Sequence, residues 1–413
     1  MTEKRKSPAL RFRGYSDDWE QRKLDDMCEI ITKQTGFDYS ATIKPSLLTE
    51  SSNETYSFIQ NKDFSGNEIN LDTDFFIPIE VAERFPKILL DKPSLLISIS
   101  GRIGNVGFYN LPQKSFIGGA VGICKLKNSQ YGEFIVQELE SDYGKNYFHS
   151  LIKASSHANI TVEDIRNINI LMPKDDCEQE KIASYFNNLD NLITLHQRKL
   201  EKLKLVKKSM LEKMFPKNGS NVPEVRFKGF TDDWEQRKLG DCFTERVESM
   251  PDGELISVTI NDGIKKFSEL GRHDNSNDDK SKYKKVCIGD IAYNSMRMWQ
   301  GASGYSPYEG IVSPAYTVLS PNSGINSKCL AYQFKLPEMI HTFQINSQGI
   351  TSDNWNLKYP ALSEIEIFIS RNEKEQAKIA EYFEWIDRLI TLHQRKVEKL
   401  NILKKSMLEK MFV

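Results

Sequence analysis

Polar loops in both halves of the chain carry the side chain types that read the edges of DNA bases. Arginine can bond guanine through two parallel hydrogen bonds, and asparagine or glutamine can do the same with adenine. The candidate base-reading residues of the first half are Arg102, Asn105, Ser156, His157 and Asn159. Those of the second half are Asn294, Arg297, Gln300, Gln348 and Asn354. Ordinary solvated loop residues are the alternative for each, and fewer than half are expected to touch a base.

A basic run in the second half is typical of contacts to phosphate rather than to bases. Lys282, Tyr283, Lys284 and Lys285 follow one another in this run, and Lys282 and Lys284 are taken as candidate DNA-binding residues. Phosphate contacts fix the position of a protein on DNA without reading its sequence. The run therefore complements the candidate base-reading loops.

Motifs for bond-making chemistry are absent from the sequence. Gly101, Gly104 and Gly107 form a GxxGxxG run, which favours a turn and a bulge over a phosphate loop. No G-x-x-x-x-G-K-[ST] loop, no [ND]-P-P-[FY] methyltransferase motif and no acidic nuclease triad occurs. The six cysteines form no C-x-x-C pair, so no zinc ribbon is expected. These absences favour binding over catalysis.

Charge and hydropathy give a general setting for these loops. Lys and Arg total 56 and Asp and Glu total 57, so any DNA-binding face must arise from local clustering. The start of the chain lacks the apolar core of a signal peptide, and no apolar run is long enough to span a membrane. A cytoplasmic protein with no membrane partner is expected.

The loops are positioned by an internal repeat. Residues 11–26 match residues 226–241 at 12 of 16 positions, with an offset of 215 residues, as from Trp19 to Trp234. Residues 190–215 match 387–412 at 21 of 26 positions, with an offset of 197. The segments between them share no comparable identity. Each half therefore contains a shared opener, a variable domain rich in short β-like runs, and a shared helix.

The shared helices are expected to pack on each other. Asp175 with Glu178, and Asn372 with Glu375, have the spacing of a helix N-cap and its third residue, and Asn187-Asn188 predicts a break in the first helix. Apolar residues recur about every 3.5 residues, which predicts a coiled coil, and two equivalent halves would pair the helices antiparallel. The predicted packing residues are Leu192, His196, Leu203, Met210, Leu389, His393, Leu400 and Met407. The two histidines are expected to be buried structural residues rather than metal ligands. Seven Lys or Arg between 196 and 213 form either a binding stripe or a solvated face.

These elements predict an α+β fold with a pseudo-two-fold internal repeat. Two variable α/β domains with β-rich cores are separated by two long helices packed as an antiparallel coiled coil. The predicted segments are an opener (1–26), a variable domain (27–172), a central helix (173–216), a second opener (217–241), a second variable domain (242–369) and a C-terminal helix (370–413).

The duplicated motifs DDWEQRKL, LITLHQRK and KKSMLEKMF resemble those of the specificity subunits of Type I restriction-modification systems. The resemblance covers the whole chain. It implies that each variable domain is a target-recognition domain that reads one half of a split, asymmetric site in double-stranded DNA. It also implies that the helices space these domains and bind two modification subunits, which methylate adenine, and that restriction subunits can join to cleave DNA. The implied cofactors, S-adenosylmethionine, ATP and Mg, would belong to those partners, and none would be bound by this chain.

Two other functions remain open at this point. One is a two-headed coiled-coil scaffold that binds no DNA, which the near-neutral charge favours. The other is an enzyme with an unrecognised catalytic site in a variable domain. DNA binding by the chain with its modification subunits would distinguish the first, and activity of the isolated chain the second.

Overall fold

The computed structural model describes residues 7–152, 159–217, 219–260, 263–274, 276–350 and 354–412. It divides into two compact units. Unit 1 comprises Met1–Gln197 and Arg395–Val413, and unit 2 comprises Arg198–Gln394. The division passes through both long helices, so each unit contains one end of each helix rather than a globular domain alone.

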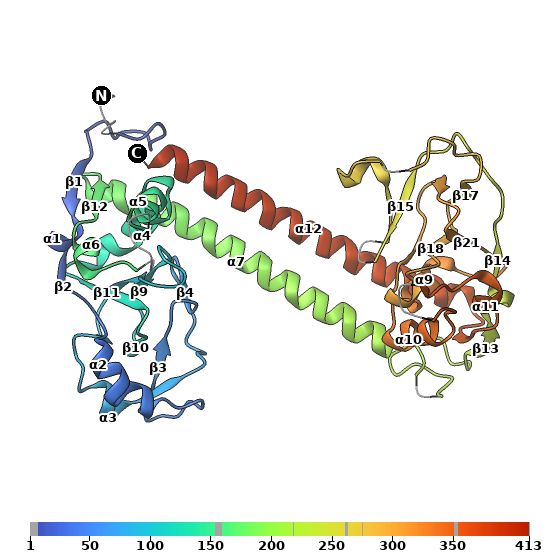
Figure 1. The fold of residues 1–413 in the computed structure, drawn as a ribbon, viewed down its shortest axis with the longest axis horizontal. Helices are drawn as coiled ribbons and strands as arrows, with labels where there is room; N and C mark the ends of the chain where they lie inside the picture. Colours follow the sequence, from blue (N-terminus) through green and yellow to red (C-terminus); the bar gives the residue numbers. More distant parts are fainter. Residues whose placement is uncertain are drawn as a thin grey trace. The chain divides into compact units, whose positions relative to one another are not determined.

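Unit 1 is built on two four-stranded sheets (Figure 1). The first has the order β2 (Cys28–Lys33), β11 (Val121–Leu126), β8 (Ser94–Ser98) and β9 (Val106–Tyr109). The second has the order β6 (Phe76–Pro78), β3 (Thr55–Ile59), β10 (Ser115–Ile117) and β7 (Leu89–Leu90). Every residue of β8 is buried. Because side chains alternate along a strand, Leu95 and Ile97 enter one core and Leu96 the other.

Helices and short elements complete unit 1. The hairpin β4 (Phe64–Ser65) and β5 (Glu68–Ile69) lies against β9 through a bridge between Gly66 and Gly107. The helices are α1 (Leu24–Met27), α2 (Gly36–Asp38), η1 (Tyr39–Ile43), η2 (Lys44–Ser46), α3 (Ile79–Ala82), η3 (Ser129–Tyr131), α4 (Gly132–Glu140), α5 (Asp142–Ile152) and α6 (Val162–Arg166).

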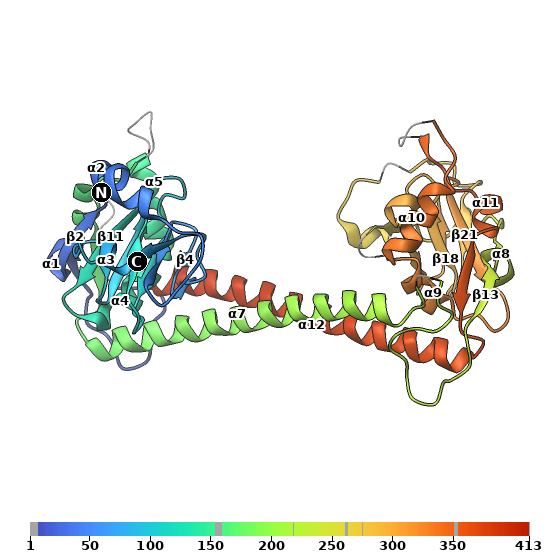
Figure 2. The same cartoon turned by 90° about the horizontal axis from the view of Figure 1, so that it is seen from below.

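Unit 2 repeats the first sheet of unit 1, although the segments between the shared regions have no comparable sequence identity. Its sheet has the order β14 (Phe243–Glu245), β21 (Tyr316–Pro321), β18 (Ile291–Asn294) and β19 (Ser303–Tyr305). Figure 2 shows helices beside β18 and β21. Two further two-stranded sheets pair β15 (Ile256–Thr259) with β16 (Gly263–Lys266), and β17 (Lys284–Val286) with β20 (Gly310–Val312). The helices are α8 (Leu239–Cys242), η4 (Phe267–Leu270), η5 (Met298–Gln300), α9 (Ser327–Gln333), α10 (Pro337–Ile345) and α11 (Tyr359–Ser363).

The shared openers close each unit by pairing with its last strand. β1 (Glu20–Lys23) is antiparallel to β12 (Asn169–Met172), and β13 (Glu235–Lys238) is antiparallel to β22 (Glu366–Ile369). The registers correspond: Glu20 lies opposite Met172 and Glu235 opposite Ile369. Each opener therefore connects the beginning of its unit to the strand that leads into a long helix.

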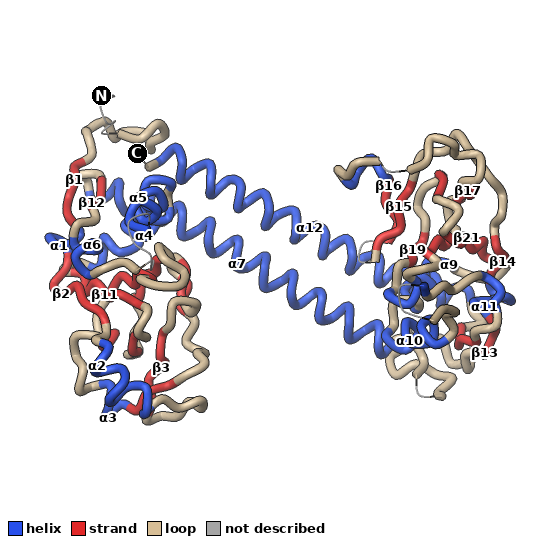
Figure 3. Tube along the Cα trace, viewed as in Figure 1, coloured by secondary structure: helices blue, strands red, loops and turns tan. Residues whose placement is uncertain are grey.

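The long helices are α7 (Asp176–Lys213) and α12 (Glu373–Met411), each continuous in Figure 3. The predicted break at Asn187-Asn188 is wrong: α7 continues there, and Asn187 Nδ2 donates to Glu133 Oε2 at 2.6 Å. The predicted N-caps are confirmed. Asp175 Oδ1 accepts from the Cys177 amide at 2.8 Å, and Asn372 Oδ1 accepts from the Lys374 amide at 3.0 Å.

The glutamates predicted to complete the caps have a different role. Glu178 is fully buried and accepts two hydrogen bonds from Arg11, at 2.5 and 2.8 Å. Glu375 accepts the equivalent pair from Arg226, at 2.6 and 2.9 Å. These hydrogen bonds raise the pKa of both arginines. Charge-assisted hydrogen bonds thus attach each opener to the first turn of its helix. The spacing of the two glutamates had instead predicted that they cap the helix.

Within each unit the two helix ends run antiparallel, as predicted. In unit 1, Lys404 Nζ bonds Asp190 at 2.7 Å, and Phe412 packs against Phe186, with ring centroids 5.7 Å apart. In unit 2, Lys207 bonds Asp387 at 2.5 Å and Phe215 stacks on Phe383 at 6.3 Å. Each unit-2 residue matches a unit-1 residue at the offset of 197, with the helices exchanged.

The predicted helix-packing residues are partly corrected. Met210 in unit 2, and Leu400 and Met407 in unit 1, pack against the core of their unit. Leu203, Leu389, His196 and His393 are half-buried. Leu192 is wrong as a packing residue because it is 44% exposed, whereas its neighbour Ile193 is buried. The buried side of α7 at this point therefore includes Ile193, one residue after the predicted Leu192, because contacts within unit 1 and not an ideal heptad determine which side chain is buried.

Candidate nucleic-acid interface

The turn between β18 and β19 carries three of the predicted base-reading residues of unit 2. Arg297 is exposed, and its Nη1 lies 3.4 Å from Gln300 Oε1. Asn294 is half-buried and its Oδ1 accepts from the Met296 amide at 3.0 Å. The turn closes on Gly301, whose φ of +80° suits glycine. The guanidinium of Arg297 is thus presented to solvent from a short, hydrogen-bonded turn.

The loop that precedes the last strand of unit 2 lies against this turn. The Leu357 amide donates to the Ser295 carbonyl at 2.9 Å, and Gln348 and Asn356 exchange two backbone hydrogen bonds. Gln348 and Asn354, the other two predicted readers, are exposed on this loop. The structure therefore brings all five predicted base-reading residues of unit 2 together on two adjoining loops, which we call the two-loop surface.

An aromatic pair joins the two loops, and sequence reasoning missed it. The indoles of Trp299 and Trp355 meet edge to face, with centroids 5.3 Å apart, and Trp299 Nε1 donates to the Met296 carbonyl at 3.1 Å. Met296 is 46% exposed beside them. The sequence signal for this pair was the presence of tryptophans within polar loops, because a large apolar indole ring is expected to pack or to bind a partner.

The predicted phosphate run lies on another strand pair. Lys282 is exposed just before β17, and Lys284 lies on β17, which pairs with β20. Lys284 Nζ is 3.3 Å from Glu245, so part of its charge is compensated within the protein. The structure does not include these lysines in the two-loop surface, and their contact with phosphate remains a prediction.

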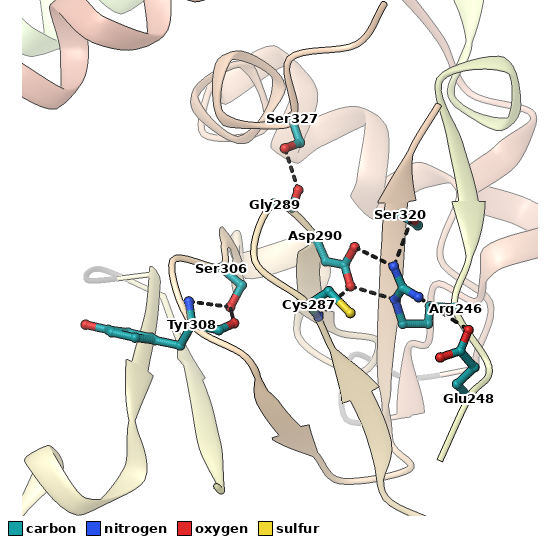
Figure 4. Close-up of polar contacts among 9 residues, drawn as sticks. All are labelled: Arg246, Glu248, Cys287, Gly289, Asp290, Ser306, Tyr308, Ser320 and Ser327. Atoms are coloured by element: carbon teal, nitrogen blue, oxygen red, sulfur yellow. Dashed lines mark hydrogen bonds and ion pairs between the residues drawn. The ribbon is translucent and has the colours of Figure 1, made fainter. Parts of the chain in front are cut away.

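An ion pair between the half-buried Arg246 and the buried Asp290 fixes the segment between β17 and β18 (Figure 4). Arg246 bonds both carboxylate oxygens of Asp290, at 2.7 and 3.2 Å, and also Ser320 Oγ at 3.1 Å. Asp290 Oδ2 further accepts from the Cys287 amide at 2.8 Å, and its bonds to Arg246 raise the pKa of the guanidinium. The start of β18, at the opposite end of the strand from the β18–β19 turn, is thus anchored by an ion pair.

Unit 1 forms the corresponding turn between β8 and β9. Gly101 and Gly104 have φ of +73° and +80°, which confirms the predicted turn. Arg102 is exposed at its tip. Asn105 Nδ2 donates to the carbonyls of Asn61 and Phe64, at 3.0 and 2.7 Å, so its amide donors stabilise the fold. Reading of a base by Asn105 would be left to its carbonyl oxygen.

The loop before the last strand of unit 1 reaches the same turn. The Ile160 amide donates to the Ile99 carbonyl at 2.9 Å, which corresponds to the Leu357–Ser295 bond of unit 2. Asn159 is exposed next to this bond, whereas Ser156 and His157 lie outside the described residues. Both units therefore form the two-loop surface in the same way from unrelated side chains.

An open hollow of about 790 Å³ adjoins the unit 1 turn. Lys62, Arg102 and Lys145 contribute its positive charge, and Asp63 and Glu68 its negative charge. Lys62 is paired with Asp74. The hollow offers room and cationic side chains beside the predicted readers.

Among the described residues there is no cluster of three His, Cys, Asp or Glu that could hold a metal ion. A search of the same part of the chain found no helix that is long and apolar enough to cross a membrane. Three of the seven basic residues between 196 and 213 form ion pairs within unit 2: Lys204 with Glu201, Lys207 with Asp387, and Lys213 with Glu224. The interpretation as a solvated, internally paired face thus holds for part of that stripe.

Comparisons with known proteins agree on one family. The model of the Type I restriction modification DNA specificity domain matches residues 16–205 and again 231–401. The putative type I restriction enzyme MjaX specificity subunit of Methanocaldococcus jannaschii is 24% identical over 237 residues, which cover 54% of this chain and 52% of that protein. The chain thus spans about half the length of this curated relative.

A solved structure shares the fold. The crystal structure of the S subunit of a Type-I restriction-modification system from M. genitalium superposes with a TM-score of 0.64 at 14% identity, covering 98% of this chain and 99% of that one. At this identity the likeness concerns the fold alone. It extends over both units, including both long helices.

Proposed function

The chain belongs to the Type I restriction modification DNA specificity domain family, and we propose that it reads a split DNA target, with one half-site assigned to each unit. Each unit would place its two-loop surface against base edges in a groove of double-stranded DNA. Specificity subunits are the non-catalytic members of their complexes, so bond-making would belong to partner subunits. The site of action would be the cytoplasm.

The matched loop contact carries this proposal. The bonds Ile160–Ile99 and Leu357–Ser295 hold equivalent loops together in the two units, at 2.9 Å in each. The side chains presented there differ: Arg102 and Asn159 in unit 1, but Arg297 and a tryptophan pair in unit 2. One scaffold with two sets of polar side chains suits the reading of two different half-sites.

Exposed apolar residues on the long helices support the docking of two modification subunits. Leu195 and Leu392 are 45% and 46% exposed, and Leu205 and Ile402 are 68% and 69% exposed. Both pairs are related by the offset of 197. Exposed apolar residues that recur in this way are typical of a duplicated interface, and a duplicated interface binds two copies of one partner. S-adenosylmethionine would be bound by these partners, and ATP and Mg by restriction subunits.

The test of half-site reading is an exchange of one variable domain. Residues 27–172 would be replaced by the equivalent segment of another family member, and the chain would be expressed with its modification subunits in a methylation-free host. Sequencing of methylated adenines should show one half-site changed and the other retained. A change in both half-sites would contradict the assignment of one half-site to each unit.

The test of docking is native mass spectrometry with the modification subunit. Two copies should bind at saturation. Leu195→Asp combined with Ile402→Asp should remove one copy, and the matched pair Leu205→Asp with Leu392→Asp the other. A single copy bound by the unaltered chain would contradict the duplicated interface.

Failure to bind DNA in the presence of these partners would favour a scaffold instead.

A further inference from the structure

A half-buried lysine lies next to the β18–β19 turn of unit 2. Lys335, which follows α9, donates from Nζ to the carbonyls of Gly301 at 2.6 Å, Ser303 at 2.8 Å and Ile260 at 3.1 Å. Gly301 and Ser303 belong to the end of the β18–β19 turn, and Ile260 to the turn that follows β15. One ammonium group therefore connects the reading turn to a neighbouring hairpin.

The three bonds use the full donor capacity of the side chain. A protonated lysine has three N–H donors, and each has a carbonyl acceptor here. Burial lowers the pKa of Lys335 to about 8, with a smaller contribution from Lys207. At neutral pH the ammonium form still predominates, so all three bonds can form together. A partly desolvated cation without acceptors would be unfavourable, and the three carbonyl dipoles offset that cost.

The same place in unit 1 is also charged. Glu138 bonds the amide of Leu171 on β12, and Gln333 bonds the carbonyl of Phe368 on β22, which makes these two residues equivalent. Two positions further along, unit 1 has Glu140 and unit 2 has Lys335. Glu140 accepts from Lys404 at 2.8 Å.

Close glycine pairs lie above this place in both units. A Cβ added to Gly66 would lie 3.1 Å from Glu140 Oε1, and Gly66 bridges to Gly107. In unit 2, a Cβ added to Gly304 would lie 2.9 Å from the Cα of Gly263. Both glycines of unit 2 follow those of unit 1 by 197 residues. The charged side chain at this place lies close to Gly66 in unit 1, and in unit 2 it bonds the Ile260 carbonyl.

We propose that Lys335 is a positioning residue for DNA reading by unit 2, holding Arg297, Gln300 and Trp299 in the geometry that discriminates bases. This inference rests on the proposed function. Selective hydrogen bonding to a base requires placement within about 0.5 Å, and a three-carbonyl clamp at the end of a short turn provides that restraint. Unit 1 restrains its own turn differently, because Asn61 Nδ2 donates to the Ser100 carbonyl at 3.0 Å.

The test compares the methylated motif of Lys335→Met with that of a matched control. Lys328→Met also removes a half-buried lysine of unit 2, but Lys328 bonds Glu384 at 3.1 Å and lies 4.8 Å from the centroid of the Tyr305 ring instead of bonding carbonyls of the turn. Lys335→Met should accept at least one additional base at the second half-site and leave the first unchanged, whereas Lys328→Met should keep both. If the unaltered chain yields no split motif, the proposed function fails. An unaltered split motif that Lys335→Met also retains would overturn only the role of Lys335.

A spectroscopic readout separates positioning from general stabilisation. The chain would be labelled with 5-fluorotryptophan, and its ¹⁹F resonances assigned by single Trp→Phe changes. Lys335→Met should shift or broaden the signals of Trp299 and Trp355, and leave Trp234 in the core of the same unit and Trp19 in unit 1 unchanged. Unchanged signals from Trp299 and Trp355 would overturn the proposal. Loss of the native Trp234 signal would overturn it equally, because Lys335 would then stabilise the core in general.

Discussion

Phe412 lies at the end of the chain, yet its side chain belongs to the core of unit 1. It is 6% exposed and contacts three aromatic rings, with centroid distances of 6.2 Å to Trp19, 5.5 Å to Phe134 and 5.7 Å to Phe186. Replacement of a buried phenylalanine by alanine costs about 3–5 kcal/mol, from lost transfer free energy and the cavity left behind. Phe412→Ala should therefore lower the unfolding free energy of unit 1 by about that amount.

Hydrogen exchange of the full chain measures this effect unit by unit. Since every 1.4 kcal/mol is a factor of ten, core amides of β8 and β11 should exchange about 100- to 4000-fold faster in Phe412→Ala. Amides of β18 and β21 in unit 2 should keep their rates. The matched control is Phe215→Ala, whose ring lies 5.9 Å from Trp234, and it should have the opposite pattern.

Faster exchange confined to residues 395–412 in Phe412→Ala would refute this reasoning. The helix end would then fray without supporting the sheet of unit 1. Faster exchange in unit 2 alone would refute the assignment of the C-terminal residues to unit 1.

Further predictions follow from buried charge and from the helices. Burial raises the pKa of Glu138 well above the ordinary value of 4.5, so folding takes up a proton at this side chain. The stabilisation that this proton uptake provides is lost as pH rises above about 4.5. Glu138→Gln, which copies Gln333, should flatten the pH dependence of unit 1 unfolding in urea, and an unchanged pH profile would contradict a protonated Glu138. Arg226→Met leaves the fully buried Glu375 unpaired and should lower the unfolding free energy of unit 2 by about 3–5 kcal/mol, with Arg11→Met doing the same to unit 1, as two urea transitions would report. Another variant inserts four residues into α7 between Leu195 and Leu203, and four at the equivalent place in α12. The insertions keep the apolar seam roughly in phase and add about 6 Å of helix. The sequenced methylated motif should keep both half-sites and gain one or two base pairs of spacer, and an active variant with the original spacer would show that the helices do not set the spacer length.

The amino-acid sequence alone was sufficient for the elements that depend on local pattern or on identity between repeats. Matching openers and helices gave the two-fold plan, and the N-caps at Asp175 and Asn372 fall where the residue types place them. The glycine run at 101, 104 and 107 predicted a turn, and the structure forms that turn between β8 and β9. Such signals are readable because a cap, a turn or a strand is determined largely by neighbouring residues.

Only the tertiary structure decided which partners those residues meet. Glu178 has the spacing of a capping residue, but it is paired with Arg11, 167 positions away. The variable domains share no evident identity, yet one four-stranded sheet of each has the same strand order, because different apolar side chains can fill equivalent cores. Tryptophans in polar loops were a sequence signal, but the Trp299–Trp355 contact and the carbonyl bonds of Lys335 form only when distant loops converge. Burial and hydrogen-bond satisfaction are properties of the folded chain, so no local pattern could have assigned them.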